Sequence, residues 1–177
     1  MTLDNVETHV TGSVRQLCKA AQDACRTLGY EPLVLTASLN CTARDAGSFL
    51  ASIARYYAGS DRSLAFIAGG ETVVRLTGTG LGGRNQEIAL SAAMGIAGLR
   101  DTAVFSLGSD GTDGPTDAAG GYCDGTTAAR LRAALVDPAA ALQNNDSYHA
   151  LAAVDGLIMT GPTGTNVNDV SVLLIRR

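Results

Sequence analysis

The chain has 177 residues, a length that suits one domain or slightly more. Hydrophobic residues make up 46% and charged residues 17%, a globular balance that excludes an intrinsically disordered chain. The net charge of −4 argues against a general binder of nucleic acids or membrane surfaces, which would carry a basic stripe.

Helices and strands are expected to alternate along the chain. From Ser13 to Leu28 the apolar positions follow helical spacing, with Ser13 as N-cap and Gly29 as the stop signal. In the second expected helix, the side chains expected to point inward are Phe49, Leu50, Ile53 and Tyr57. In chain order, the expected elements are helix 13–28, strand 32–36, helix 43–58, strands 64–68 and 72–77, helix 84–97, strand 102–107, helices 126–135 and 146–154, and strands 156–159 and 170–175.

This alternation predicts a single α/β domain over residues 1–177, with helices packed on both faces of a sheet. The expected strand 72–77 follows strand 64–68 too closely for a crossover helix, so these two strands must be antiparallel. We therefore predict an α/β fold with a mixed, mainly parallel sheet.

The N-terminal residues 1–10 carry neither the basic start nor the apolar core of a signal peptide. No apolar run approaches the ~20 residues that a membrane span needs. We therefore expect a cytoplasmic protein. The cysteines form no CxxC pair and no metal-ligand spacing with His9 or His149, so we expect buried free thiols and isolated histidines at the surface or at helix caps.

The first glycine-rich loop joins an expected strand to an expected helix. Gly78, Gly80 and Gly83 satisfy the GxGxxG spacing of dinucleotide sites, but the helix opens on RNQE, where a Rossmann helix would pack apolar residues. A plain glycine turn is a second alternative. We favour an anion site, because N–H groups at a helix N-terminus suit phosphate or carboxylate. Lys19 is the only lysine, and Arg84 would add a bidentate donor at this point.

The second loop, GSDGTDGPTDAAG, carries three carboxylates, from Asp110, Asp113 and Asp117. It follows a buried strand, and ligands of open α/β sheets bind where strands end. The spacing is not that of an EF-hand. One aspartate is expected to make an Asx-turn, and another to bind Mg²⁺ or orient a substrate hydroxyl.

The third loop, TGPTGTNVND over residues 160–169, also follows a short strand. It offers hydroxyls, amides and free backbone N–H groups, and it is longer and more polar than a simple turn needs to be. We expect it to hold an oxyanion or the hydroxyl of a sugar acid. The chain contains neither a Walker A motif nor a GxSxG nucleophile elbow.

Four segments occur in this order along the chain: GGETVVRLTGTGLGGRNQEIAL, GSDGTDGPTDAAGGYCDGTT, NNDSYHAL and TGPTGTNVNDVSVLLI. Together they resemble the glycerate 2-kinase family, whose C-terminal domain is called the MOFRL domain. The opening segment THVTGSVRQLCKAAQDACRTLGYEPLVL is similar to the stretch that leads into that domain. The resemblance covers nearly the whole chain.

The resemblance implies phosphorylation of D-glycerate to 2-phosphoglycerate with ATP and Mg²⁺, in a cleft between this domain and a larger N-terminal α/β domain. It implies that Arg84 contacts phosphate or the glycerate carboxylate, that Asp110 serves the substrate hydroxyl or the metal, and that Asn166 orients the substrate. The residues implied to line or support the cleft are Glu71, Asn85, Glu87, Asp113, Asp117 and Thr165.

The resemblance also implies a nucleotide site and a catalytic lysine in an N-terminal domain that these 177 residues do not contain. Lys19 lies outside every motif, so we expect the chain to be catalytically incomplete without that domain, supplied in cis or in trans. Two alternatives stay open. One is an NAD(P)H-dependent hydroxypyruvate reductase, a label often given to this family, and the other is a non-catalytic binding or assembly module.

Overall fold

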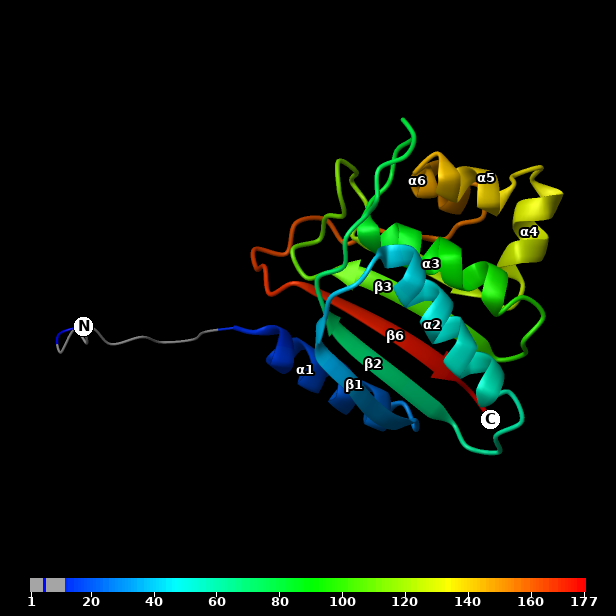
Figure 1. Cartoon of the computed structure of the whole chain (residues 1–177). Coiled ribbons are helices and arrows are strands. Elements are labelled where there is room, and N and C mark those ends of the chain that lie inside the picture. The colour runs from blue at the N-terminus through cyan, green and yellow to red at the C-terminus, as the bar shows by residue number, and fades with distance from the viewer. Residues whose placement is uncertain (1–4, 6–11) are drawn as a thin grey trace.

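The computed structural model describes Asn5 and residues 12–177, which form a six-stranded sheet with helices on both faces (Figure 1). The strands are β1 (Glu31–Leu39), β2 (Leu64–Gly70), β3 (Thr102–Gly108), β4 (Gly120–Asp124), β5 (Leu157–Ile158) and β6 (Asp169–Ile175). The helices are α1 (Val14–Thr27), α2 (Ala43–Tyr56), α3 (Arg84–Gly95), α4 (Thr127–Ala133), α5 (Pro138–Gln143) and α6 (Ser147–Ala152).

The sheet has the strand order β1-β2-β6-β3-β4-β5. Only the β1–β2 pair is parallel among these strands, and the other four pairs are antiparallel. The mixed α/β fold is thus confirmed, but the expectation of a mainly parallel sheet is wrong. Helix α3 does connect β2 to a strand of the same direction, β3. The final strand, β6, then inserts between them and runs against both.

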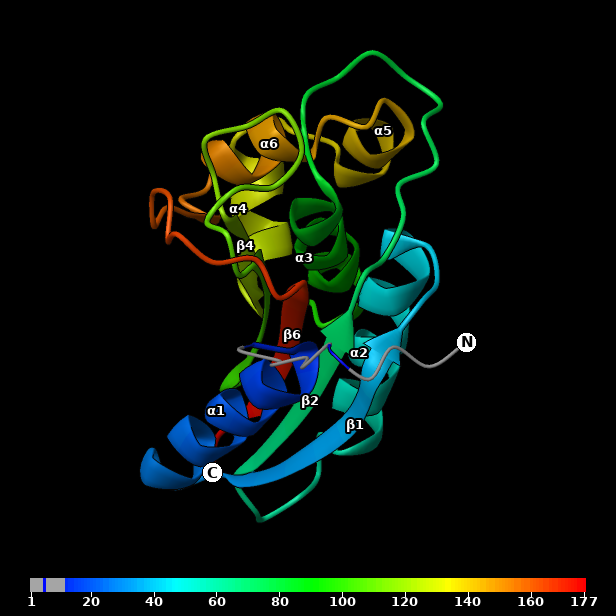
Figure 2. The same ribbon diagram turned by 90° about the vertical axis from the view of Figure 1, so that its left-hand side faces the viewer.

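Residues 72–77 do not form the predicted strand. Apart from an isolated bridge between Thr42 and Val73, this stretch makes no strand pairing. It belongs to a long excursion, residues 71–83, that leaves the sheet after β2 and returns at α3 (Figure 2). The sheet is mixed because β6, β3, β4 and β5 form antiparallel pairs, and not because residues 72–77 form a strand antiparallel to β2.

The core has three parts, one on each face of the sheet and one behind α3. On one face, α1 covers β1, β2 and β6 through buried Cys18 and Cys25, while α2 and α3 cover the opposite face. Helices α4, α5 and α6 pack on the outer side of α3, so α3 is buried from Asn85 to Ala93 (Figures 1 and 2). Phe49 of α2 is 58% exposed rather than inward, because α2 turns only its Leu50 face to the sheet.

All four cysteines are free, as expected; Cys18, Cys25 and Cys123 are buried, while Cys41 is half-buried. His149 lies at the surface of α6 beside Asp146, with 2.6 Å between its Nδ1 and a carboxylate oxygen. His9 lies outside the described residues. In the described part of the chain, no helix has the length and apolar character that crossing a membrane requires.

Candidate functional site

Three loops meet at one edge of the sheet, as the family resemblance implied. Asp169, the first residue of β6, pairs with Gly70 at the end of β2 on one side and with Gly108 at the end of β3 on the other. Since β6 runs against both neighbours, its start lies where they end. This register brings together residues 71–83, 109–119 and 159–168, which we call the loop cluster.

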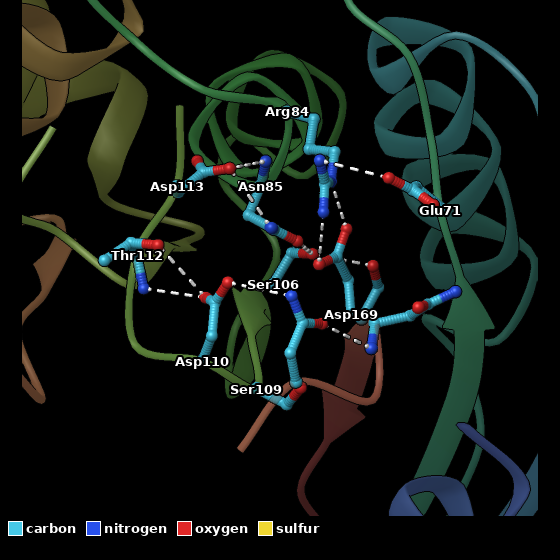
Figure 3. A network of polar contacts seen from close by, with 12 residues as sticks. Glu71, Arg84, Asn85, Ser106, Ser109, Asp110, Thr112, Asp113 and Asp169 are labelled. Atoms are coloured by element: carbon cyan, nitrogen blue, oxygen red, sulfur yellow. Dashed lines mark hydrogen bonds and ion pairs between the residues drawn. The ribbon is translucent and has the colours of Figure 1, made fainter. Parts of the chain in front are cut away.

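Arg84 lies at the centre of the loop cluster, on the first turn of α3. Its Nε and Nη2 groups donate to the two carboxylate oxygens of Asp169, at 2.5 and 3.0 Å (Figure 3). Glu71 lies on the other side, with an oxygen 3.5 Å from Nη1. The Arg84 side chain stays 35% exposed, whereas that of Asp169 is only 7% exposed. The hydrogen bond to Asp169 raises the pKa of Arg84, which keeps it charged.

Asp113 occupies the N-terminus of α3. One of its carboxylate oxygens accepts from the backbone N–H and the side-chain amide of Asn85, and the other accepts from the backbone N–H of Gln86 at 2.9 Å. Asp113 is 3% exposed, and burial raises its pKa to about 6. The prediction that these two N–H groups bind a ligand anion is therefore wrong, because both already donate to the Asp113 carboxylate.

A series of buried, hydrogen-bonded polar side chains lies beneath the loop cluster. The Ser106 hydroxyl of β3 donates to the Asn85 side-chain oxygen at 2.5 Å and lies 2.8 Å from the Ser171 hydroxyl of β6. Asn85 in turn donates to Asp113, and all four residues are buried. These hydrogen bonds connect α3, β3, β6 and the second loop, so they fix the relative positions of these segments.

Asp110 joins the second loop to the third. Its carboxylate accepts from the backbone N–H of Thr112 at 3.0 Å (Figure 3). It also accepts from the Asn166 side-chain amide at 3.3 Å. The backbone N–H of Ser109 donates to Asn168, which ties the same two loops together again. Asp110 is half-buried and Asn166 is exposed, so both remain within reach of a ligand.

Glu87 and Asn145 hold the excursion of residues 71–83. The Asn145 side-chain oxygen accepts from the backbone N–H groups of Thr77 and Gly78, at 2.7 and 2.9 Å. Its amide donates to Glu87, which also forms a 3.1 Å ion pair with Arg44. Burial raises the pKa of Glu87, and Arg44 opposes that rise. Glu87 and Arg84 line a groove of about 520 Å³ under the excursion.

The GxGxxG glycines pack against protein atoms. A Cβ on Gly78 or Gly80 would lie 2.4 Å from atoms of the turn at residues 144–146, and one on Gly83 would lie 2.3 Å from Asp113. These contacts explain why side chains are absent here. In a dinucleotide site, the glycines and the helix N-terminus approach a pyrophosphate instead.

The predicted site residues thus fall into two groups. Those with a polar side chain still open to solvent in or beside the loop cluster are Glu71, Arg84, Asp110, Thr165 and Asn166. Those buried in internal contacts are Asn85, Glu87 and Asp113. Asp117 is exposed and accepts a 2.8 Å hydrogen bond from Tyr148 of α6. Their individual roles stay predictions.

Sequence reasoning missed Asp169 and Asn145 as organising residues. Asp169 stands 85 positions from its partner Arg84, so no local pattern could pair them. Asn145 lies in the segment NNDSYHAL, and it adopts a left-handed backbone with φ of 56°.

The described residues contain no group of three or more His, Cys, Asp or Glu side chains arranged to hold a metal ion. Asp110 offers a carboxylate beside the Asn166 amide. The Asn166 side-chain oxygen accepts from the Asn168 backbone N–H, so the Asp110 carboxylate alone would offer oxygens to Mg²⁺, with water and phosphate oxygens completing the octahedron, as is common for that ion.

Comparison with known proteins gives consistent results. The MOFRL family model matches residues 64–169. D-glycerate 2-kinase of Thermotoga maritima is 51% identical over 177 residues, which cover 98% of this chain and 42% of that protein. A putative hydroxypyruvate reductase of Agrobacterium vitis is 40% identical over 88% of this chain and 42% of that protein.

The fold is also similar to that of a solved structure. The crystal structure of glycerate kinase from Thermotoga maritima superposes with a TM-score of 0.95 at 50% identity, covering 99% of this chain and 43% of that one. The chain therefore spans about two-fifths of the length of the curated relatives it matches.

Proposed function

The chain belongs to the MOFRL family, and from this premise we propose that it forms the substrate- and phosphate-facing part of an ATP-dependent glycerate 2-kinase. The kinase name belongs to relatives that are more than twice as long as this chain. What supports the proposal here is the half-exposed, permanently charged Arg84 at the centre of the loop cluster. A guanidinium with free N–H groups suits the glycerate carboxylate and a transferred phosphate equally well.

Phosphoryl transfer depends on positioning and on charge neutralisation more than on covalent chemistry. Arg84 would neutralise the anion, and Asp110 would orient the substrate hydroxyl or accept its proton. Thr112 and Asn166 hold the Asp110 carboxylate in one orientation for that task. Asp110 is also the residue that would hold Mg²⁺, which when bound would neutralise charge on the phosphate oxygens.

We propose that the nucleotide and a catalytic lysine are supplied by a further domain, in cis or in trans. Lys19 is exposed on α1 and pairs with Asp23 at 2.5 Å. Helix α1 covers the sheet face opposite α3, where Arg84 lies. A coupled assay with the 177-residue chain alone should show no phosphorylation of D-glycerate, and measurable turnover would contradict this part of the proposal.

The reductase alternative has one observation in its favour, the name of the relative from Agrobacterium vitis. A dinucleotide would need the glycines and the α3 N-terminus, which pack against protein atoms and against Asp113. We therefore expect no change in NADH fluorescence when the chain is added. Saturable binding would favour the reductase.

A calorimetric titration with D-glycerate, 2-phosphoglycerate and inorganic phosphate tests the proposed function against a non-catalytic module. Arg84→Ala should weaken binding of 2-phosphoglycerate by about tenfold or more, as loss of a charge-assisted bidentate contact does. Arg55→Ala is the matched control, because Arg55 is exposed in the last turn of α2, away from the loop cluster. Equal binding by the two variants would refute the assignment of Arg84.

A further inference from the structure

We propose that Asp169 holds the side edge of the Arg84 guanidinium so that the adjacent end edge binds the substrate anion, and that Glu71 competes for that end edge. This inference rests on the proposed function of Arg84. It assigns opposite effects to two residues, a positioning role to Asp169 and a competing role to Glu71, and neither role follows from the sequence motifs.

A guanidinium offers two edges to a carboxylate or a phosphate. The side edge consists of Nε and one Nη, and the end consists of the two Nη groups. Asp169 takes the side edge completely, with Nε at 2.5 Å and Nη2 at 3.0 Å from its two oxygens. The end edge, formed by Nη1 and the second N–H of Nη2, is left for a ligand.

The position of Asp169 is built into the sheet. Its two ladder neighbours are Gly70 and Gly108, neither of which has a side chain that could cover the carboxylate. Gly70 has a φ of 152°, and a Cβ there would lie 2.3 Å from Leu39 backbone atoms. Arg84 and Asp169 are the first residues of α3 and β6, so the pair joins two rigid elements.

Glu71 stands beside Nη1, one of the two nitrogens of the end edge. Its carboxylate lies 3.5 Å from Nη1, its side chain is 60% exposed, and no hydrogen bond joins the two groups. An exposed pair of this kind is weak, so a ligand anion can displace it. Glu71 would thus oppose anion binding, a more specific role than the lining of the cleft that the resemblance implied.

Variants of the two carboxylates test the proposal. For Asp169→Asn, simple electrostatics and positioning predict changes in anion affinity of opposite sign. Both Asp169→Asn and Glu71→Gln remove one negative charge close to Arg84, and charge alone predicts tighter anion binding in both variants. Positioning predicts that Asp169→Asn weakens 2-phosphoglycerate binding by about fivefold or more, because the amide replaces one of the two acceptor oxygens with an NH₂ donor that faces the guanidinium. Glu71→Gln should strengthen binding about two- to fivefold.

The experiment combines calorimetry with NMR of the ¹⁵N-labelled chain. The Nε–H resonance of Arg84, identified by its loss in Arg84→Lys, should be sharp and slow to exchange in the wild type and in Glu71→Gln. It should be lost in Asp169→Asn, while the backbone spectrum away from the loop cluster stays unchanged. In an Arg84→Lys background, Asp169→Asn should no longer weaken binding by the same factor.

Tighter binding in both carboxylate variants would overturn the positioning role of Asp169, and so would a sharp Nε–H resonance in Asp169→Asn. A wild-type chain that binds none of D-glycerate, 2-phosphoglycerate or phosphate would instead overturn the proposed function of Arg84. The Nε–H resonance would still decide whether Asp169 holds the guanidinium, so the two failures are distinguishable.

Discussion

A single methyl group at Gly83 should disrupt the N-terminus of α3. Gly83 has an extended backbone, φ −135° and ψ 177°, so alanine meets no conformational penalty there. A Cβ at this position would nevertheless lie 2.3 Å from the Asp113 Cγ and within 2.5 Å of both carboxylate oxygens. The carboxylate must move away in Gly83→Ala, and it must then release the N–H groups that it caps.

The expected cost follows from those contacts. Three donors, two on Asn85 and one on Gln86, lose an acceptor that lies 2.9 to 3.2 Å away. Each buried donor left unsatisfied costs ~1–3 kcal/mol, and the contributions of neighbouring groups are not additive. We expect Gly83→Ala to lower the free energy of unfolding by about 3 kcal/mol, a fall in Tm of about 6–12 °C for a chain of this length.

Chemical denaturation at pH 7.5 measures this loss. Gly59→Ala is the control, because no atom lies within 4 Å of a Cβ there. In an Asp113→Ala background the obstructing carboxylate is gone, so Gly83→Ala should cost less than ~1 kcal/mol, and the double-mutant cycle should show strong coupling. A loss no larger than that of Gly59→Ala, or additive effects in the cycle, would refute the capping role of Asp113.

Three further predictions concern Asn145, Asp113 and Cys123. Asn145→Ala should destabilise the chain by ~2 kcal/mol and expose residues 71–83 to limited proteolysis, whereas stable, uncut protein would contradict its role as their anchor. The folded pKa of Asp113, about 6, lies above its unfolded value of 3.8, so its contribution to stability is fully present below pH ~4 and lost as the pH rises through about 6. Relative to Asp113→Asn, the wild-type free energy of unfolding should therefore fall by up to ~3 kcal/mol over that range, and a constant difference would rule this out. Burial raises the pKa of Cys123 to about 12, so a thiol reagent should modify half-buried Cys41 first and Cys123 only on unfolding, and early labelling of Cys123 would show that its site opens.

Local sequence signals identified most elements but not their arrangement. Ser13 caps α1 as expected, with its hydroxyl accepting from Gln16 at 3.3 Å, because capping depends on residues three positions apart. Strand β4 was missed because GGYCD is short and rich in glycine. The insertion of β6 between β2 and β3 pairs residues that are far apart in the sequence, so no local hydrophobic periodicity predicts it.

The candidate site shows the same division. The family resemblance implied that the loops share a cleft, but their meeting depends on β6, which starts beside the ends of β2 and β3 because it runs against both. What fills the α3 N-terminus could not be foreseen, because Asp113 lies 28 positions after Asn85 and free N–H groups look alike whether a ligand or the protein caps them. Sequence therefore indicated the residues of an anion site, while the fold determined which of them remain available.

The most direct test of the account follows Arg84 itself by NMR as 2-phosphoglycerate is added to the ¹⁵N-labelled wild-type chain. If Asp169 keeps the side edge and the ligand takes the end edge, the Nη resonances of Arg84 should shift and slow their exchange, while Nε–H stays in place. A shift of Nε–H would mean that the ligand displaces Asp169. No change at any Arg84 nitrogen at saturation would mean that the anion binds elsewhere, and either result would contradict the account.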